Sequence, residues 1–360
     1  MTAEHCELCG PGRRKFLTGL VAIASASVVG TTSAQKQTGA AASTGRNWID
    51  VHHHLVPPGY LNQVPSDDAV PGASATPRRA LAEWSVERSI DQMDQAGVSS
   101  SMLSISNPGI WFGDTEKARK LARDCNEYAA RLVTAYPKRF GMFAALPLPD
   151  VEGGLREIEY ALDVLKADGI GLYTSYGNKW LGDPAFDAIF AELNRRKALV
   201  YTHPTTADCC RNLQPAVSPN VVEYQTDTTR AIAGILASGT ASRFPDVRII
   251  FSHAGGTMPF LIERFAGWAK SPQIARRLPQ GLNHELERFY YDTAQTSNNV
   301  AMGALAKLVP NSQILFGTDY PFRTVVEHVR NLTECGVFNE AQLAAIGRGN
   351  ALALFPRLAA

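Results

Sequence analysis

The chain has 360 residues, of which 45% are hydrophobic and 19% are charged, so it can build a large core and is not generally disordered. The 35 Lys and Arg residues nearly balance the 34 Asp and Glu residues, which excludes a chain-wide electrostatic attraction to nucleic acid or anionic membranes. Six cysteines are too few for a disulfide scaffold.

The N-terminal segment differs in composition from the rest of the chain. Arg13 and Arg14 precede an apolar run rich in Ala and Val over 18–30, and small residues follow it up to Ala34. This order resembles a twin-arginine export signal, and the run is shorter than the ~20 residues of a membrane span. We predict a signal peptide over 1–34, a flexible lead-in over 35–46 and a periplasmic or secreted protein. A floppy N-terminal tail is the alternative.

From residue 48 onward, short apolar segments alternate with longer amphipathic ones. In chain order we predict a strand at 48–51, a helix at 86–96, a strand at 100–105, a helix at 115–136, a strand at 141–146, a helix at 153–165, a strand at 170–173, a helix at 184–196, a strand at 199–202, a helix at 228–238, a strand at 248–251, a helix at 258–270, a strand at 289–291, a helix at 299–308, a strand at 313–316 and helices at 325–335 and 340–354. About eight strand–helix units without a clear linker predict one (β/α)₈ TIM-like barrel over 47–360. A doubly wound open sheet is the alternative, but no G-x-G-x-x-G motif follows the first strand.

Polar clusters follow four of the predicted strands and contain His52 and His54, His203, His253, and Asp319. The carboxyl ends of parallel barrel strands meet on one face, so these side chains are expected to converge. Residues i and i+2 of a strand point the same way, which lets His52 and His54 share one ion.

Three imidazoles and one carboxylate are suitable ligands for Zn²⁺ or another first-row divalent ion. We predict that His52, His54, His203 and Asp319 hold one metal ion and leave a coordination position open. We predict that His253 is a nearby general acid or base. The alternative for each histidine is a hydrogen-bonded structural role at a strand end. Five of the eight histidines fall in three strand-end clusters, and this recurrence favours the metal site.

In this order, the residues resemble the amidohydrolase superfamily, and specifically its decarboxylase branch, typified by aminocarboxymuconate-semialdehyde decarboxylase. The most specific segments are SHAGGTMPF at 252–260, GTDYPF at 317–322 and GNA at 349–351. The sequences of segments 51–58, 177–184 and 228–231 are most similar to those of family members called 6-methylsalicylate decarboxylase. The resemblance covers nearly all of the chain after the N-terminal segment and implies the same four metal ligands, with His253 as the catalytic acid or base. We also predict a catalytic role for Asp319, because the proton for the substrate could come either from metal-bound water relayed by His253 or from the side of a protonated Asp319.

The resemblance also suggests substrate-binding residues. Arg264, eleven residues after His253, would reach into the site of a neighbouring subunit, which implies a homodimer; a solvated helix residue is the alternative. Arg88 is the nearest candidate for a second family arginine but is offset by one position. Asp292 follows another strand and either orients His253 or the metal-bound water, or caps the next turn.

Two departures from the family pattern bear on the pocket. Thr205 stands where many branch members carry Trp after the His-Pro pair, so we expect a different pocket. The predicted strand 170–173 supplies no Lys for a carbamylated binuclear site, which favours one metal ion over two. We predict that this ion is Zn²⁺, with Mn²⁺ as the alternative.

These residues support a metal-dependent, non-oxidative decarboxylase of a hydroxylated aromatic or related unsaturated carboxylic acid, such as a 6-methylsalicylate-like substrate. The alternative is a hydrolase of a lactone, ester or amide that uses metal-bound hydroxide. A non-catalytic metal-binding protein is a third possibility, although such a scaffold does not require His253. We expect a small-molecule carboxylic acid as the partner, with neither nucleic acid nor a membrane span.

Overall fold

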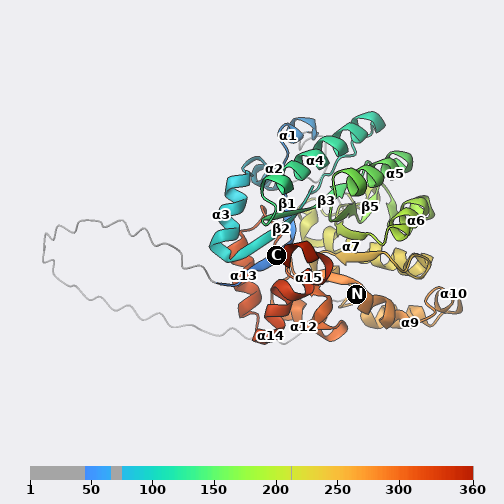
Figure 1. The fold of residues 1–360 in the computed structure, drawn as a ribbon. Helices are drawn as coiled ribbons and strands as arrows, with labels where there is room; N and C mark the ends of the chain where they lie inside the picture. The colour runs from blue at the N-terminus through green and yellow to red at the C-terminus, as the bar shows by residue number, and fades with distance from the viewer. Residues whose placement is uncertain (1–44, 66–74, 212, 360) are drawn as a thin grey trace, which may run out of the picture. The chain divides into compact units, whose positions relative to one another are not determined.

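Eight parallel strands form one sheet, and this computed structural model describes residues 45–65, 75–211 and 213–359 (Figure 1). The strands are β1 (Trp48–His54), β2 (Val98–Ser104), β3 (Phe140–Ala145), β4 (Gly169–Tyr173), β7 (Leu199–His203), β8 (Arg248–Phe251), β9 (Tyr290–Asp292) and β10 (Ile314–Leu315), and they neighbour one another in that order. The predicted signal over 1–34 lies outside the described residues, as does most of the predicted lead-in over 35–46.

The segment after β10 returns to β1 and closes the sheet into a barrel. The Val51 N–H donates to the Phe316 carbonyl at 2.9 Å, and the Asp319 N–H donates to the His52 carbonyl at 2.8 Å. A parallel bridge joins His53 to Tyr320. The predicted TIM-like barrel is therefore confirmed, and the open sheet is excluded.

Helices surround the strands (Figure 1). Those that follow barrel strands are α3 (Val86–Ala96), α4 (Thr115–Ala135), α5 (Val151–Glu159), α6 (Asp187–Arg195), α7 (Pro219–Ser238), α9 (Ile262–Ala269), α12 (Asn299–Leu308) and α13 (Val325–Glu334). Shorter elements are α1 (Tyr60–Gln63), α2 (Ala75–Ala82), the hairpin strands β5 (Ser175–Tyr176) and β6 (Lys179–Trp180), α8 (Thr240–Arg243), α10 (Pro272–Ala275), α11 (Leu282–Arg288), α14 (Glu340–Ala344) and α15 (Asn350–Leu354). In the described part of the chain, no helix is long and apolar enough to cross a membrane.

Local sequence signals explain where several helices begin and end. The Ser85 hydroxyl accepts from the Arg88 N–H and starts α3, which ends at Gly97 with a left-handed φ of 73°. The carboxylate of Asp114 accepts from the Lys117 N–H and starts α4. The predicted bounds of α3, 86–96, agree with the structure, because the sequence carries a start signal at Ser85 and a stop signal at Gly97.

Several predicted helices differ from the structure. The one predicted at 153–165 begins at Val151 and is π-helical over Tyr160–Val164, and the one predicted at 184–196 begins with a 3-10 turn at Pro184–Phe186. Helix α7 begins at Pro219 rather than at 228, because a proline suits the first turn of a helix. Helix α9 begins at Ile262 rather than at 258, because the preceding residues form tight turns, in which the Phe260 N–H donates to the Thr257 carbonyl at 3.1 Å and the Leu261 N–H to the Met258 carbonyl at 3.0 Å. The predicted helix 340–354 contains a π-helical segment at Ala345–Gly349, between α14 and α15.

The barrel interior is packed with apolar side chains at the amino ends of the strands. Ile49, Leu199 and Phe143 belong to a cluster that also includes Leu354 and Phe355 from the C-terminal segment. The rings of Phe143 and Phe355 lie 5.9 Å apart. The C-terminal segment therefore covers this end of the barrel, and the polar clusters lie at the opposite, carboxyl end.

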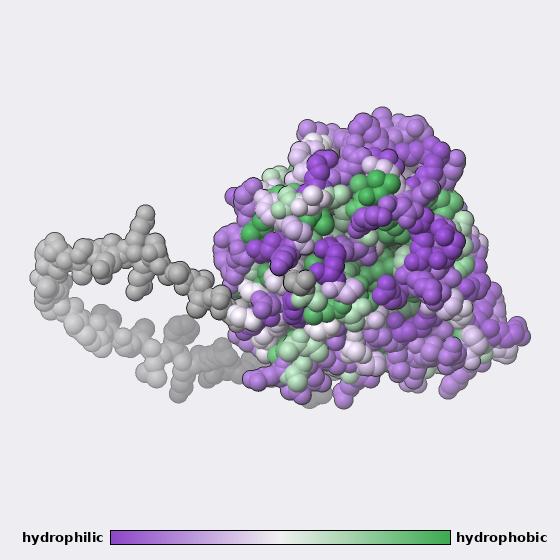
Figure 2. Space-filling view, viewed as in Figure 1, coloured by the Kyte–Doolittle hydropathy of each residue, from purple (hydrophilic) through white to green (hydrophobic). Residues whose placement is uncertain are grey.

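Hydrophilic side chains cover most of the molecular face in Figure 2, and hydrophobic residues occupy smaller areas between them. The apolar residues of the strands are instead buried inside the barrel or beneath the helices.

Candidate metal centre

Four side chains converge at the carboxyl ends of β1 and β7 and just after β10. The Oδ1 atom of Asp319 lies 2.9 Å from His54 Nε2, 3.1 Å from His52 Nε2 and 3.9 Å from His203 Nε2. One ligand atom from each of the four residues lies within 4.8 Å of the others, and all four residues are buried. The structure therefore brings the four predicted metal ligands together.

The second ring nitrogen of each histidine points at an acceptor. His52 Nδ1 lies 2.8 Å from Asp292 Oδ2, and His203 Nδ1 lies 2.8 Å from the Pro204 carbonyl oxygen. His54 Nδ1 is 3.3 Å from the Ser104 carbonyl oxygen. For His52 and His203 these acceptors require a proton on Nδ1, so each neutral ring has its lone pair on Nε2. Nδ1 of His54 also lies 3.2 Å from the Ser104 hydroxyl, which can donate as well as accept.

The charges at this centre call for a cation. Burial lowers the pKa of His203 to about 4 and also lowers the pKa of His54, so both rings are neutral at pH 7. Burial opposes a charge on His52 too, but the carboxylates of Asp292 and Asp319 outweigh it and raise the pKa of His52 to about 10. Burial also works against the ionised form of Asp319, yet His52 and the other imidazoles hold the pKa of Asp319 well below its usual range. A proton on His52 or a bound cation can supply the positive charge.

A divalent ion fits these residues. His203 Nε2 is buried and has no hydrogen-bond partner among the described residues, which leaves an unused acceptor beside Asp319. Three imidazole nitrogens and one carboxylate oxygen are common ligands for first-row divalent ions. His52, His54, His203 and Asp319 would hold the ion.

The backbone around the cluster tolerates little change. Asp319 has a left-handed φ of 65°, and its N–H is bonded to the His52 carbonyl. A Cβ on Gly317 would lie 2.9 Å from the Cβ of His52 and 3.0 Å from that of Asp292. Only glycine therefore lets the chain after β10 approach β1 and β9 so closely.

A buried carboxylate ties the two ligand-bearing segments together. Asp50 Oδ1 accepts from the N–H of His52 at 3.0 Å and from the N–H of Thr318 at 3.1 Å. Asp50 Oδ2 lies 2.9 Å from His53 Nδ1, and His53 Nε2 lies 2.7 Å from the Ser89 hydroxyl. Although Ser, His and Asp in a row resemble a hydrolytic triad, both ring nitrogens of His53 are engaged and Asp50 holds the backbone of the two segments. Their arrangement is structural.

His253 lies beside the cluster, directly after β8. Its ring centroid is 4.9 Å from that of His52, and its Nδ1 donates to the Ala294 carbonyl at 2.8 Å. This bond leaves Nε2 free of hydrogen bonds to the described residues. Burial lowers the pKa of His253, so the neutral ring can accept a proton and releases it readily.

Asp292 orients the His52 ring and also caps a turn. Its Oδ2 contacts His52, while its Oδ1 accepts from the N–H groups of His253 at 2.9 Å and Ala294 at 3.0 Å. The His253 ring is oriented by a carbonyl instead. Because the Asp292 carboxylate is fully buried and engaged, this geometry does not support its predicted contact with substrate.

Comparison with known proteins places this chain in a family. The Amidohydrolase family profile matches residues 49–357. The chain belongs to the amidohydrolase family. It is 37% identical to Decarboxylase yanB of Aspergillus niger, over 86% of this chain and 87% of that protein. It is also 37% identical to a 6-methylsalicylic acid decarboxylase of Penicillium expansum, over 86% and 96% of the two chains. The predicted branch and the carboxy-lyase class are confirmed.

A solved structure shares the barrel of this amidohydrolase. It is a dihydroxybenzoic acid decarboxylase from Polaromonas sp. JS666, with bound manganese and the inhibitor 2-nitroresorcinol. The TM-score is 0.70 at 22% identity, over 86% of this chain and 97% of that chain. At this identity the similarity shows only that the two proteins share the barrel fold.

The two predicted arginines do not join the cluster within this amidohydrolase chain. Arg264 lies on α9 with an exposed side chain, and its guanidinium makes no hydrogen bond or ion pair with the described residues. Arg88 is also exposed, and its Nη1 donates to the Glu83 carbonyl at 2.9 Å. Roles for Arg264 and Arg88 in substrate binding remain predictions.

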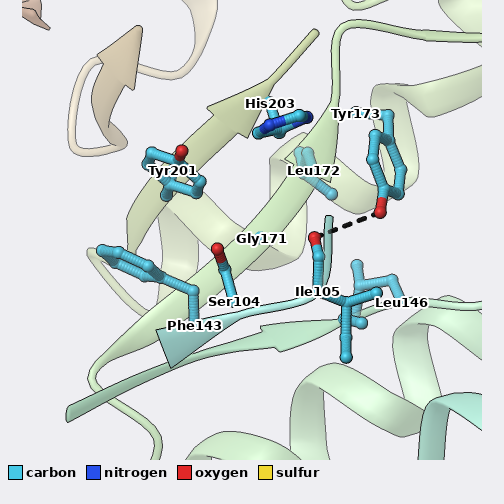
Figure 3. Close-up of a pocket in the computed structure, with 10 residues that line it drawn as sticks. Ser104, Ile105, Phe143, Leu146, Gly171, Leu172, Tyr173, Tyr201 and His203 are labelled. Atoms are coloured by element: carbon cyan, nitrogen blue, oxygen red, sulfur yellow. Dashed lines mark hydrogen bonds between the residues drawn. The ribbon is translucent and has the colours of Figure 1, made fainter. Parts of the chain in front are cut away.

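A pocket lies inside the barrel between β2, β3, β4 and β7 (Figure 3). His203 and Tyr173 line it, together with Phe143 and Tyr201, whose rings stack at 4.9 Å. The Tyr173 hydroxyl donates to the Ile105 carbonyl at 3.1 Å, which holds the ring against the pocket. This pocket adjoins the metal centre through His203.

Sequence reasoning missed several polar residues around this centre. The Thr205 hydroxyl donates to Asn107 Oδ1 at 3.1 Å, and the Asn107 amide donates to the Tyr224 hydroxyl, which links β2 to β7 and α7. The Gln295 amide donates to Asp319 Oδ2 at 3.1 Å. Asn107 and Gln295 each follow a barrel strand, and that position is the one signal that could have found them.

Proposed function

We propose that the chain is a metal-dependent decarboxylase of a hydroxylated aromatic carboxylic acid, with 6-methylsalicylic acid as the first candidate substrate. The observation that carries this proposal is the cluster of His52, His54, His203 and Asp319 with His253 beside it. The likeness to the Penicillium 6-methylsalicylic acid decarboxylase supports the substrate class.

The ion is proposed to be a single Zn²⁺, because three imidazoles and one carboxylate suit it. Mn²⁺ is the alternative, supported by the manganese in the Polaromonas structure. When bound, a divalent ion supplies Lewis-acid attraction for the carboxylate and the ortho oxygen of the substrate. Metal content measured by mass spectrometry on the purified protein separates the two ions.

Residues of this chain transfer the proton and orient the side chain that carries it. Because Nδ1 carries the proton of the neutral ring, His253 Nε2 would first take up a proton from solvent and then deliver it to the ring carbon that bears the carboxylate. The bond from that carbon to the carboxylate then breaks, its electrons return to the ring, and CO₂ leaves. The Ala294 carbonyl keeps the His253 ring oriented through Nδ1 during this transfer.

The decisive experiment follows CO₂ release from 6-methylsalicylate, salicylate and 2,6-dihydroxybenzoate, with a panel of lactones and esters in parallel. We expect CO₂ release that disappears in His253→Ala while the bound metal remains. Hydrolysis of a lactone or ester without CO₂ release from any aromatic acid would contradict the proposal. Absence of bound metal after Zn²⁺ or Mn²⁺ is added would contradict the metal site.

A homodimer completes the proposed site. Phe260 is 88% exposed, and Arg264 is exposed one turn further along the same segment. Burying this apolar ring against a second copy would carry Arg264 to a neighbouring site, where it can neutralise a carboxylate. Mixing His253→Ala with Arg264→Ala subunits tests this, since only an arginine that acts across the interface lets the mixture recover activity. Light scattering gives the oligomeric state.

Export through the twin-arginine route is proposed from Arg13 and Arg14. Replacing both with Lys is expected to retain the protein in the cytoplasm of a bacterium that has the route. Unchanged export would contradict this assignment.

A further inference from the structure

The two oxygens of Asp319 have different surroundings. Oδ1 faces the ring nitrogens of His52 and His54 at 3.1 and 2.9 Å. Oδ2 accepts a hydrogen bond from Gln295 Nε2 at 3.1 Å. The carboxylate is therefore held from both sides, with only one oxygen directed at the histidines.

Gln295 is itself held in place. It follows β9 with a φ of 57°, a left-handed conformation that residues other than Gly, Asn and Asp seldom adopt. Its backbone N–H donates to Nε2 of the buried His328 at 3.0 Å. His328 lies on α13, and its Nδ1 is 3.3 Å from the Thr324 carbonyl oxygen. Tertiary contacts thus maintain an unfavourable backbone conformation, as is common at functional sites.

We propose that Gln295 is a positioning residue that makes Asp319 a one-oxygen metal ligand. This inference rests on the proposed function, in which Asp319 binds the ion. A carboxylate can bind a metal ion through one oxygen or through both. By engaging Oδ2, the Gln295 amide fixes the plane of the carboxylate and keeps Oδ1 directed at His52 and His54.

The test compares Gln295→Met and Gln295→Asn with Gln273→Ala. Methionine has nearly the length and volume of glutamine but lacks the amide donor. Asparagine keeps the amide and tolerates the left-handed backbone, but it is one methylene too short to reach Oδ2. Gln273 is an exposed glutamine on α10 and serves as the matched control.

The measurement is the Mn²⁺ dissociation constant of the metal-free protein, read from the electron paramagnetic resonance signal of free Mn²⁺. We expect both Gln295 variants to bind Mn²⁺ about 10- to 100-fold more weakly, as is typical when a residue that orients a ligand is lost. Gln273→Ala should match the parent protein. Melting temperatures of the metal-free proteins identify a variant that fails to fold, in which case the other Gln295 variant supplies the comparison.

Parent-like Mn²⁺ affinity in a folded Gln295 variant would overturn the inference. A second readout is kcat for CO₂ release at saturating Mn²⁺, which we expect to fall in both Gln295 variants while KM changes less. If the parent protein binds no Mn²⁺ or Zn²⁺, the proposed function fails rather than the role of Gln295 alone.

Discussion

Nδ1 of His52 lies 2.8 Å from Oδ2 of Asp292, and neither side chain is exposed. This contact joins the end of β1 to the end of β9 and turns the opposite ring nitrogen of His52 toward Asp319. A carboxylate behind a histidine ligand fixes the orientation of the ring and makes it more basic. The position of the proposed metal ion thus depends on Asp292, which need not touch it.

Asp292→Asn should weaken metal binding without removing a ligand. The amide keeps the size of the side chain but lacks the negative charge, so we expect about a 10- to 100-fold loss in metal affinity. Dialysis against a chelator followed by mass spectrometry measures the loss. Asp246→Asn, at an exposed position, is the control and should retain parent affinity. Equal retention by both variants would show that Asp292 does not tune His52.

Gly317→Ala should disrupt the centre through steric contact. The new Cβ would lie 2.9 Å from the Cβ of His52 and 3.0 Å from that of Asp292, so one of the two segments must shift. We expect a loss of bound metal and a lower Tm. Gly303→Ala on α12 is the control, because no atom lies within 4 Å of its new methyl group and alanine favours a helix by about 1 kcal/mol. A Gly317→Ala protein with full metal content would contradict this account.

Metal binding should release protons and weaken as the pH falls. The pKa of His52 is raised to about 10, so the metal-free site carries a proton at pH 7 that a bound ion must displace. Because the protonated form dominates below that pKa, lower pH opposes binding. We expect affinity to fall about tenfold per pH unit near neutrality, with about one proton released per ion. Calorimetry in buffers of different ionisation enthalpy measures the release.

The control for the pH experiment is His284→Ala, which removes an exposed imidazole outside the cluster. It should leave the pH dependence unchanged. Affinity that does not vary with pH would mean that His52 is already neutral before the ion binds.

Asp50→Asn should destabilise the fold. Asp50 accepts from the N–H groups of His52 and Thr318 and contacts His53, and the amide replaces one accepting oxygen with a donor. We expect a loss of about 3 kcal/mol in the free energy of unfolding, measured by urea denaturation. Asp91→Asn, on the exposed side of α3, should change it by less than about 0.5 kcal/mol. Equal losses in both variants would assign no anchoring role to Asp50.

The sequence was sufficient to predict the barrel and the convergence of His52, His54, His203 and Asp319. Strand–helix alternation is a local pattern, and parallel strands necessarily present their carboxyl ends on one face. Histidines are rare enough that their recurrence at strand ends was informative. The bounds of α3 followed from its two terminal signals for the same local reason.

The roles of residues that act through tertiary contacts could not be predicted. Gln295 and Asn107 are of common polar types, and their roles arise only when the barrel brings distant segments together. The start of α9 at Ile262 follows a series of turns over 257–261, which the apolar spacing of 258–270 does not indicate. The orientation of Asp292 toward His52 rather than toward the His253 ring likewise required the three-dimensional arrangement.

Left-handed backbone conformations gather in the loops that carry the chemistry. His253, Ala254, Gln295 and Asp319 all have φ between 54° and 65°, and they follow three consecutive strands of the barrel. Such conformations are unfavourable for residues with side chains and persist only where the surrounding fold enforces them. The free-energy cost of these backbone conformations is therefore met once, when the chain folds, and does not recur at each turnover.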